Sequence, residues 1–273
     1  MENYISEIQS LFQQERLRDA GSVIKRFEED FPEEAKENEL ARIIKQDLSL
    51  ADQCLHLLGD MDDWTLVKQS ENIATFTKGN SSDFMVRAEM TMKHSIFPIL
   101  ALFSECQLLN EWVPILEDAK VIGSPSKFRR LIQYFLKMPW PIENRDAVVS
   151  AVGIPIQENR SILIVLKSID ENNYLSFPIP ETNSTRIDIN PACLNIHQIE
   201  SNEVQISLVA RVDVKLALIP VAIVNYAAKH GVFYFMNAVK EMCDEYSGSK
   251  YEELVRSKPE YYQEIRRRLS TFA

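Results

Sequence analysis

Glycine is scarce in this chain. Only seven glycines occur among 273 residues, and the closest two are Gly231 and Gly248. A dinucleotide-binding fingerprint, a Walker A loop and a G-x-S-x-G nucleophile elbow each need two or more glycines within a few positions. The sequence therefore excludes all three motifs.

Cysteine and histidine are few and scattered. The four cysteines (Cys54, Cys106, Cys193 and Cys243) form no C-x-x-C pair, and no histidine has a His, Cys or carboxylate partner at the spacing of metal ligands. We therefore expect no metal, no cofactor and a reducing compartment. Because no nucleophile, base and stabiliser are placed to converge, the sequence also argues against an enzyme.

Basic residues and long apolar runs are lacking too. Thirty Lys and Arg face forty Asp and Glu, a net charge of −10, which argues against binding nucleic acid. The first residues lack the basic and apolar regions of a signal peptide. The longest conspicuous apolar stretch, 216–228, contains Pro220 and Asn225 and is too short to span a bilayer. We expect a cytoplasmic protein.

Residues 1–60 have helical periodicity. Two apolar stripes recur at spacings of three and four: Leu17, Ala20, Ile24, Phe27 and Phe31, then Leu40, Ile44, Leu48, Ala51, Leu55 and Leu58. They predict a helical hairpin whose first helix is split. We favour packing of this hairpin on the main domain, because amphipathic stripes mostly form core; the alternative is a hairpin that binds a protein partner or dimerises.

Residues 61–215 change to a period of two. Seven apolar positions alternate with mostly polar ones in the longest such segment: Val204, Ile206, Leu208, Ala210, Val212, Val214 and Leu216. This pattern is typical of a half-buried antiparallel strand. Further strands are predicted near 84–92, 128–138, 145–154, 161–169 and 186–199, and one short helix near 95–110.

The C-terminal part returns to helix. Pro220 is suited to the first turn of a helix, after which one face carries Val224, Ala227, Ala228, Gly231, Phe235, Ala238, Val239 and Met242. The small residues near the start of this face predict a close approach by another part of the molecule. Residues 249–273 are read as a short charged tail broken at Pro259.

This order predicts an α+β fold with three parts. They are an N-terminal helical hairpin (1–60), a main domain (61–248) and the charged C-terminal tail (249–273). In the main domain a bent antiparallel sheet is closed by one long C-terminal helix. If sheet and helix are too far apart for side chains to fill the space, the core becomes a cavity.

Three segments resemble a known family. They are Glu111-Trp112-Val113-Pro114, the Pro-Trp-Pro and Asn-Arg-Asp stretch within 137–146, and the helix start at 219–231. Together they resemble the START (steroidogenic acute regulatory protein-related lipid transfer) domain, and especially its phosphatidylcholine-transfer-like group, over about residues 62–245. The resemblance implies a helix-grip fold that binds one lipid in a hydrophobic tunnel and moves it between membranes without chemistry.

The resemblance also suggests where lipid would bind. The candidates for the tunnel and its helical lid are Val224, Ala227, Ala228, Gly231, Phe235, Val212, Leu208 and Tyr134. The arginines that meet the head group in phosphatidylcholine and sterol carriers are replaced here by Leu109 and Ala151. Gln133, Tyr134, Arg129 and Arg130 remain as polar candidates, because alternation alone does not fix which of them point inward.

The motif residues themselves have a structural interpretation. We expect Asn144, Arg145 and Asp146 to fix the start of a strand, and Trp112 and Trp140 to pack near the bases of loops. A membrane-docking Trp140 is the less favoured alternative. The leading functional hypothesis is a lipid carrier with glycerophospholipid favoured over sterol. The rivals are a ligand-sensing or protein-interaction module that uses the hairpin, and, more weakly, a cyclase-like enzyme.

Overall fold

The computed structural model describes residues 1–79, 84–138, 140, 142–213, 215 and 221–270, and leaves the side chains of 221–229 undescribed. Its helices are α1 (Glu2–Gln13), α2 (Leu17–Asp30), α3 (Pro32–Glu37), α4 (Glu39–Gly59), α5 (Ile96–Ser104), α6 (Val221–Asp244), α7 (Lys250–Ser257) and α8 (Pro259–Leu269), with short 3-10 turns η1 (Cys106–Glu111) and η2 (Gln157–Asn159).

The strands are β1 (Thr65–Gln69), β2 (Ile73–Lys78), β3 (Met85–Met92), β4 (Leu116–Ser126), β5 (Arg129–Leu136), β6 (Arg145–Ile156), β7 (Ser161–Ser168), β8 (Asn173–Tyr174), β9 (Phe177–Pro178), β10 (Thr185–Arg186), β11 (Asp188–Glu200) and β12 (Glu203–Asp213). Of these, β8 and β9 form a separate two-stranded ribbon.

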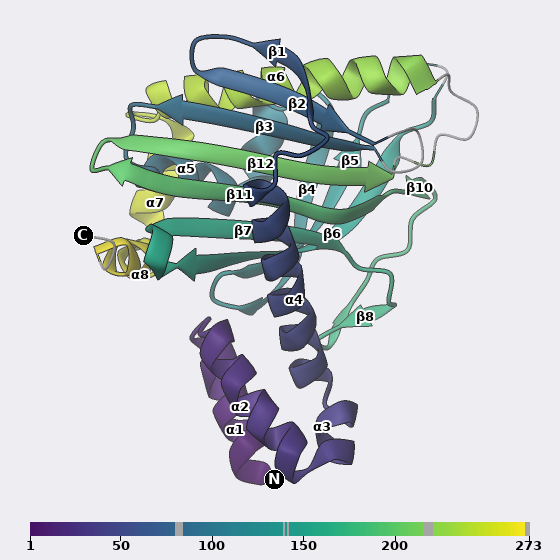
Figure 1. Ribbon diagram of the computed structural model, residues 1–273, viewed down its shortest axis with the longest axis vertical. Coiled ribbons are helices and arrows are strands. Elements are labelled where there is room, and N and C mark those ends of the chain that lie inside the picture. Colours follow the sequence, from purple (N-terminus) through teal and green to yellow (C-terminus); the bar gives the residue numbers. More distant parts are fainter. Residues whose placement is uncertain (80–83, 139, 141, 214, 216–220, 271–273) are drawn as a thin grey trace.

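One large sheet organises the molecule (Figure 1). Its strand order is β1-β2-β3-β12-β11-β7-β6-β5-β4, all antiparallel, and β10 pairs in parallel with the start of β6. Helix α6 runs along β1, β2 and β3. This arrangement confirms the expected α+β helix-grip fold with a long helix laid on the sheet.

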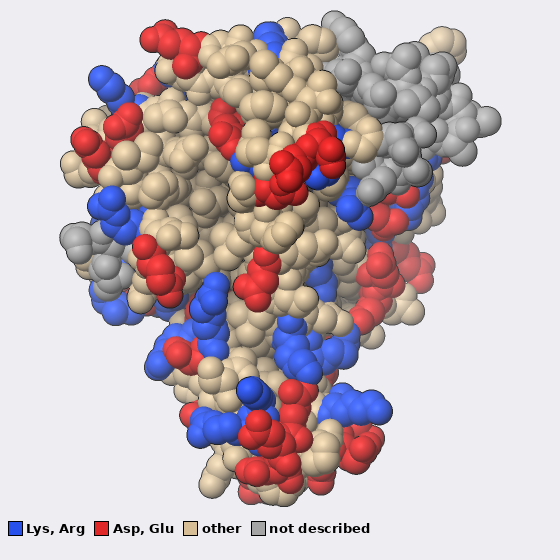
Figure 2. All heavy atoms as spheres, in the orientation of Figure 1, with Lys and Arg blue, Asp and Glu red and all other residues tan. Residues whose placement is uncertain are grey.

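The N-terminal helices cover one face of the sheet, which we call the outer face. Helix α4 crosses β7, β11 and β12, and its Leu50, Ala51 and Cys54 are buried in one cluster with Val165 and Val209 of the sheet. The hairpin thus packs on the main domain, the interpretation that the sequence favoured. Figure 2 shows acidic and basic side chains interspersed over α1 to α3 at the far end of these helices.

A buried ion pair links α4 to the sheet. Arg129 on β5 donates to Asp47 on α4 at 2.6 Å, and also to Ser150 Oγ at 3.1 Å and the Tyr174 hydroxyl at 3.2 Å. The Arg129 and Asp47 side chains are 0% and 4% exposed. Because a buried charge is stable only when paired, this contact fixes how the helices dock on β5.

The expectation of a charged C-terminal tail is corrected. Residues 250–269 form α7 and α8, and Tyr251, Val255, Tyr262 and Ile265 are buried in the main core. The expected break at Pro259 is the boundary between α7 and α8, and Pro259 begins α8, where its missing N–H costs nothing.

Helices α7 and α8 are anchored by one buried carboxylate. Glu105, only 1% exposed, accepts hydrogen bonds from Lys258 and Tyr262. Burial alone would raise the pKa of the Glu105 carboxyl, but these hydrogen bonds outweigh burial and lower the pKa. The charged residues that made this segment look like a tail therefore help to dock it.

Candidate binding site on the inner face of the sheet

The inner face is the face opposite α4, covered by α5, α6, α7 and α8. Strand register aligns five residues across its centre: Arg130 on β5 pairs with Ala151 on β6, Ala151 with Leu166 on β7, Leu166 with Ala192 on β11, and Ala192 with Ala210 on β12. Side chains at paired positions point to the same face. We call these five residues the alanine row, since three of them are alanines.

The alanine row is only partly buried although it lies in the middle of the sheet. The next residues along each strand point to the outer face, where Val152, Val165, Cys193 and Val209 are at most 3% exposed in one cluster with the N-terminal helices. Among the described residues, the sheet is therefore packed more tightly behind the alanine row than in front of it. Alanine side chains are short, and they leave more room in front of the sheet than larger side chains would.

The space closes toward one end of the sheet. Four residues along β11 and β12 from Ala192 and Ala210, Ile196 pairs with Ile206, which in turn pairs with Met90 of β3. These three residues are at most 1% exposed and pack in one cluster with Met236 of α6. In the other direction, Val212 on β12 is 37% exposed. Of the two tunnel candidates on β12, Leu208 is therefore partly buried against the α6 cluster, and Val212 is exposed near the end of the strand.

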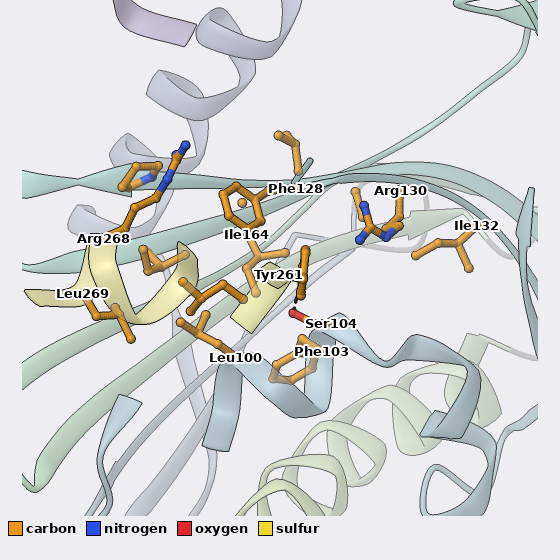
Figure 3. Close-up of a pocket in the computed structure, with 16 residues that line it drawn as sticks. Leu100, Phe103, Ser104, Phe128, Arg130, Ile132, Ile164, Tyr261, Arg268 and Leu269 are labelled. Carbon is orange, nitrogen blue, oxygen red and sulfur yellow. Dashed lines mark hydrogen bonds between the residues drawn. The ribbon is translucent and has the colours of Figure 1, made fainter. Parts of the chain in front are cut away.

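A pocket of about 100 Å³ lies beside the Arg130 end of the row (Figure 3). Strands β5, β6 and β7 form one wall through Ile132, Ala151 and Ile164, while α5 and α8 contribute Leu100, Phe103, Tyr261 and Leu269. The Tyr261 hydroxyl donates to Ser104 Oγ at 3.3 Å, a bond between the two helices at the pocket.

Register also decides which polar residues of β5 point inward. Arg129 and Gln133 face outward, toward Asp47 and Asp146, and Arg130 and Tyr134 face inward. Tyr134, a tunnel candidate, packs among the apolar residues beside η1, where burial raises the pKa of its phenol.

The face assigned to α6 from sequence is confirmed at Val239, Phe235 and Met242, which pack in the core cluster, but it is not centred on the most buried residues. The most buried positions of its described part are Phe233, Met236, Val239 and Cys243. Gly231 is exposed, and a Cβ placed there would meet nothing within 4 Å, so the close approach expected at this glycine is not observed. The remaining lid candidates, Val224, Ala227 and Ala228, have side chains outside the described residues.

Phe235 and Trp112 belong to one aromatic contact on the inner side. Their rings stack with centroids 5.9 Å apart, and the Trp112 indole N–H donates to the Tyr251 hydroxyl at 2.8 Å. Trp112 therefore packs at the base of its loop and holds α7 at the same time. Burial raises the pKa of the Tyr251 phenol to about 12, so it stays neutral.

The Asn144-Arg145-Asp146 motif ties strand ends together. Asn144 accepts from the Met138 N–H at 3.1 Å and donates to Glu117 at 3.0 Å. Arg145 donates to the Glu143 carbonyl at 2.7 Å, while Asp146, fully buried, accepts from other partners, Arg186 at 2.7 Å and Gln133 at 3.0 Å.

Trp140 departs from expectation, because its side chain is 93% exposed and does not pack at a loop base. The loop that carries it joins β5 to β6 at the end of the sheet where β12 ends at Asp213, one residue after Val212. Ile115, 51% exposed, is at the same end, since its carbonyl accepts from the Lys137 N–H at 2.8 Å.

The described residues include no cluster of His, Cys, Asp and Glu that could hold a metal ion. Among the helices of the described chain, none is both long and apolar enough to cross a membrane.

The sequence does not single out the pocket residues Tyr261, Ile265 and Leu269, because the charged segment that contains them resembles a tail. The spacing of apolar residues could have predicted this helix, because Tyr262, Ile265 and Leu269 recur at intervals of three and four.

Comparisons with known proteins agree with this architecture. The family described as "START domain" matches residues 46–248, most of the chain. No curated protein matches. Among solved structures, human StAR-related lipid transfer protein 5 superposes with a TM-score of 0.65 at 11% identity, covering 74% of this chain and 96% of that one. Human STARD10 gives 0.64 at 15% identity, covering 77% and 82%. On its matched segment and its sheet and helix order, the chain belongs to the START domain family.

Proposed function

We propose that this protein binds a single lipid between the inner face of the sheet and α6, and carries it between membranes without covalent chemistry. The observation that carries this proposal is the alanine row. Its alanines and Leu166 are partly exposed at the centre of the sheet, whereas the neighbouring residues on the outer face, Val152, Val165, Cys193 and Val209, are buried. A concave apolar site with few polar groups is what a lipid-binding protein requires.

We place membrane contact at the end of the sheet where β12 ends and the loop of Trp140 lies. Ile115, Trp140 and Val212 are all exposed there, at 51%, 93% and 37%. Tryptophan is favoured at membrane interfaces because its ring is amphipathic. We therefore propose transient docking of this end on a membrane surface by a cytoplasmic, peripherally associated protein.

For the ligand class we propose a glycerophospholipid rather than a sterol, because the motifs at 137–146 and 219–231 resemble those of phosphatidylcholine carriers. Ala151, at the position of the sterol-carrier arginine, lies in the alanine row, and Leu109 is buried in the cluster beside η1. Both positions are apolar, so the head group must be held elsewhere.

The alternative is a ligand-sensing or interaction module in which the N-terminal helices (1–60) bind a protein partner. One experiment separates the two. Purified protein is incubated with donor vesicles that contain fluorescent phosphatidylcholine, and its transfer to acceptor vesicles is measured. A carrier accelerates transfer in proportion to protein concentration, and Trp140→Ala slows it with unchanged binding. Binding without any transfer would favour the sensing module.

A further inference from the structure

The pocket beside Arg130 has walls that the family match does not include. Helix α8, which supplies Tyr261, Ile265 and Leu269, lies in 259–269, beyond the matched residues 46–248. Most of the lining is aliphatic or aromatic. A volume of about 100 Å³ is smaller than the engineered cavity of about 150 Å³ that holds benzene, so the pocket has room for a small terminal group and not for a whole lipid.

Arg130 brings a positive charge to this apolar pocket. One terminal nitrogen of its guanidinium donates to the carbonyls of Lys127 and Arg129, both at 3.0 Å, in the turn between β4 and β5. The guanidinium carbon lies 5.2 Å from the centroid of the Tyr261 ring. The carbonyls and the ring hold the group in place, and the other guanidinium nitrogens have no acceptor among the described residues.

The charge of Arg130 is not balanced by a carboxylate. No Asp or Glu oxygen of the described residues lies within 4.0 Å of it, whereas neighbouring Arg129 pairs with Asp47, and Arg268, also at the pocket, pairs with Glu264. A cation beside apolar walls is costly unless it is paired, and an arginine with unused donors is suited to a carboxylate or phosphate. The missing partner is therefore expected to come from a ligand.

The alanine row gives that ligand a place for its apolar part. Four steps between neighbouring strands separate Arg130 from Ala210, about 19 Å along the sheet at roughly 4.8 Å a step. One leaflet of a bilayer has a hydrocarbon depth of about 15 Å, half of the roughly 30 Å core. An acyl chain can lie along the row while its polar end reaches Arg130.

We infer that Arg130 binds the anionic group, carboxylate or phosphate, of a lipid whose acyl chain lies along the alanine row. This inference rests on the proposed function and adds a ligand class to it. It excludes ligands without an anionic oxygen, such as sterols, from the preferred set.

Matched pairs of probes test the inference. The protein is incubated with an equimolar mixture of oleate and oleyl alcohol, which compete for binding. In a separate experiment it is incubated with dioleoyl phosphatidic acid and dioleoylglycerol. Bound lipid is extracted, and mass spectrometry gives the ratio of the two bound probes. We expect the anionic probe to bind about 10- to 100-fold more tightly than the neutral probe, which is the difference in affinity that one charged hydrogen bond provides. The pair with the larger preference identifies carboxylate or phosphate as the natural group.

Two variants, Arg130→Met and Ala151→Asp, locate the effect, and Lys127→Met is their control. Arg130→Met should reduce the preference to about onefold, and Lys127→Met, which removes an exposed cation of the same turn, should leave it unchanged. Because Arg130 also bonds the turn, Ala151→Asp serves as a second test: it places a carboxylate directly opposite Arg130, which should remove the preference while the turn bonds remain.

The outcomes are distinct. Equal binding of anionic and neutral probes by the parent protein, or an anion preference that survives both Arg130→Met and Ala151→Asp, overturns the inference and leaves the lipid carrier intact. Binding of none of the four probes contradicts the proposed function itself.

Discussion

Replacing Ala192 by leucine tests whether the inner face is hollow. Ala192 lies in the middle of the alanine row and is partly exposed, between Leu166 and Ala210. The substitution adds three carbon atoms at this point. If space is present, leucine should fill it without disturbing the sheet and should occupy part of the volume that we assign to lipid.

The magnitude follows from burial. Each buried methylene contributes about 0.8 kcal/mol, so three would stabilise the fold by at most about 2.4 kcal/mol. Since the site is only partly covered, we expect the free energy of unfolding to change by about 0 to +1 kcal/mol. In a filled core the same change would destabilise the protein by about 1–3 kcal/mol through overpacking.

The assay is urea unfolding of protein refolded without lipid, because bound ligand would itself shift the midpoint. The control is Ala51→Leu, the same substitution at a position 2% exposed between α4 and the outer face. We expect Ala51→Leu to lose stability but to load lipid normally where it folds, and Ala192→Leu to keep stability but load less. Equal losses of stability in both variants would refute the hollow inner face.

Three further changes test the contacts that hold the fold. Arg129→Met leaves Asp47 buried without its partner and should lower the free energy of unfolding by about 3–5 kcal/mol, measured in urea; a loss below about 1 kcal/mol would contradict a buried pair. Because hydrogen bonds from Tyr262 and Lys258 lower the pKa of Glu105, its stabilisation is complete above the unfolded-state pKa and is lost as pH falls through the lower folded-state pKa. Glu105→Gln should therefore lower stability at pH 7 and flatten its decline below about pH 4, and an unchanged pH profile would contradict this anchor. Arg145→Ala should lower the unfolding midpoint and leave the bound-lipid profile unchanged, whereas an unchanged midpoint with altered lipid would place it in the site.

Regular alternation made most of the sheet predictable. Strand β12 follows its apolar pattern from Val204 to Val212, because one face points to the inner side of the sheet, where Val204 and Ile206 are buried and Leu208 and Ala210 are partly buried. Strand β4 was not predicted, since register shifts near Leu116, Val121 and Gly123 interrupt the period of two. A pattern of side chains predicts a strand only where the ladder is regular.

The site was less predictable than the fold because it depends on register and on helix rotation. Arg129 and Arg130 are adjacent in sequence, yet one is buried under α4 and the other faces the pocket. The row of Ala151, Ala192 and Ala210 combines three separate strands and has no signature in any one of them. Pairing between strands creates these features, and local sequence does not specify it.

The C-terminal helices were missed for a different reason. Charged residues dominate 249–269, and the buried Tyr251, Val255, Tyr262 and Ile265 are too few to outweigh them in a reading by composition. Their role depends on Glu105 and Trp112, more than a hundred residues earlier in the chain. Contacts of this range become visible only in the folded molecule.

Native mass spectrometry of the protein purified from cells tests the central claim most directly. The account predicts one lipid for each chain, released by organic extraction and identified as a species with an anionic oxygen, with lower occupancy in Ala192→Leu than in Ala51→Leu. A protein that carries no lipid from cells, and takes up none from vesicles, would contradict the claim that the inner face of the sheet is a lipid-binding site.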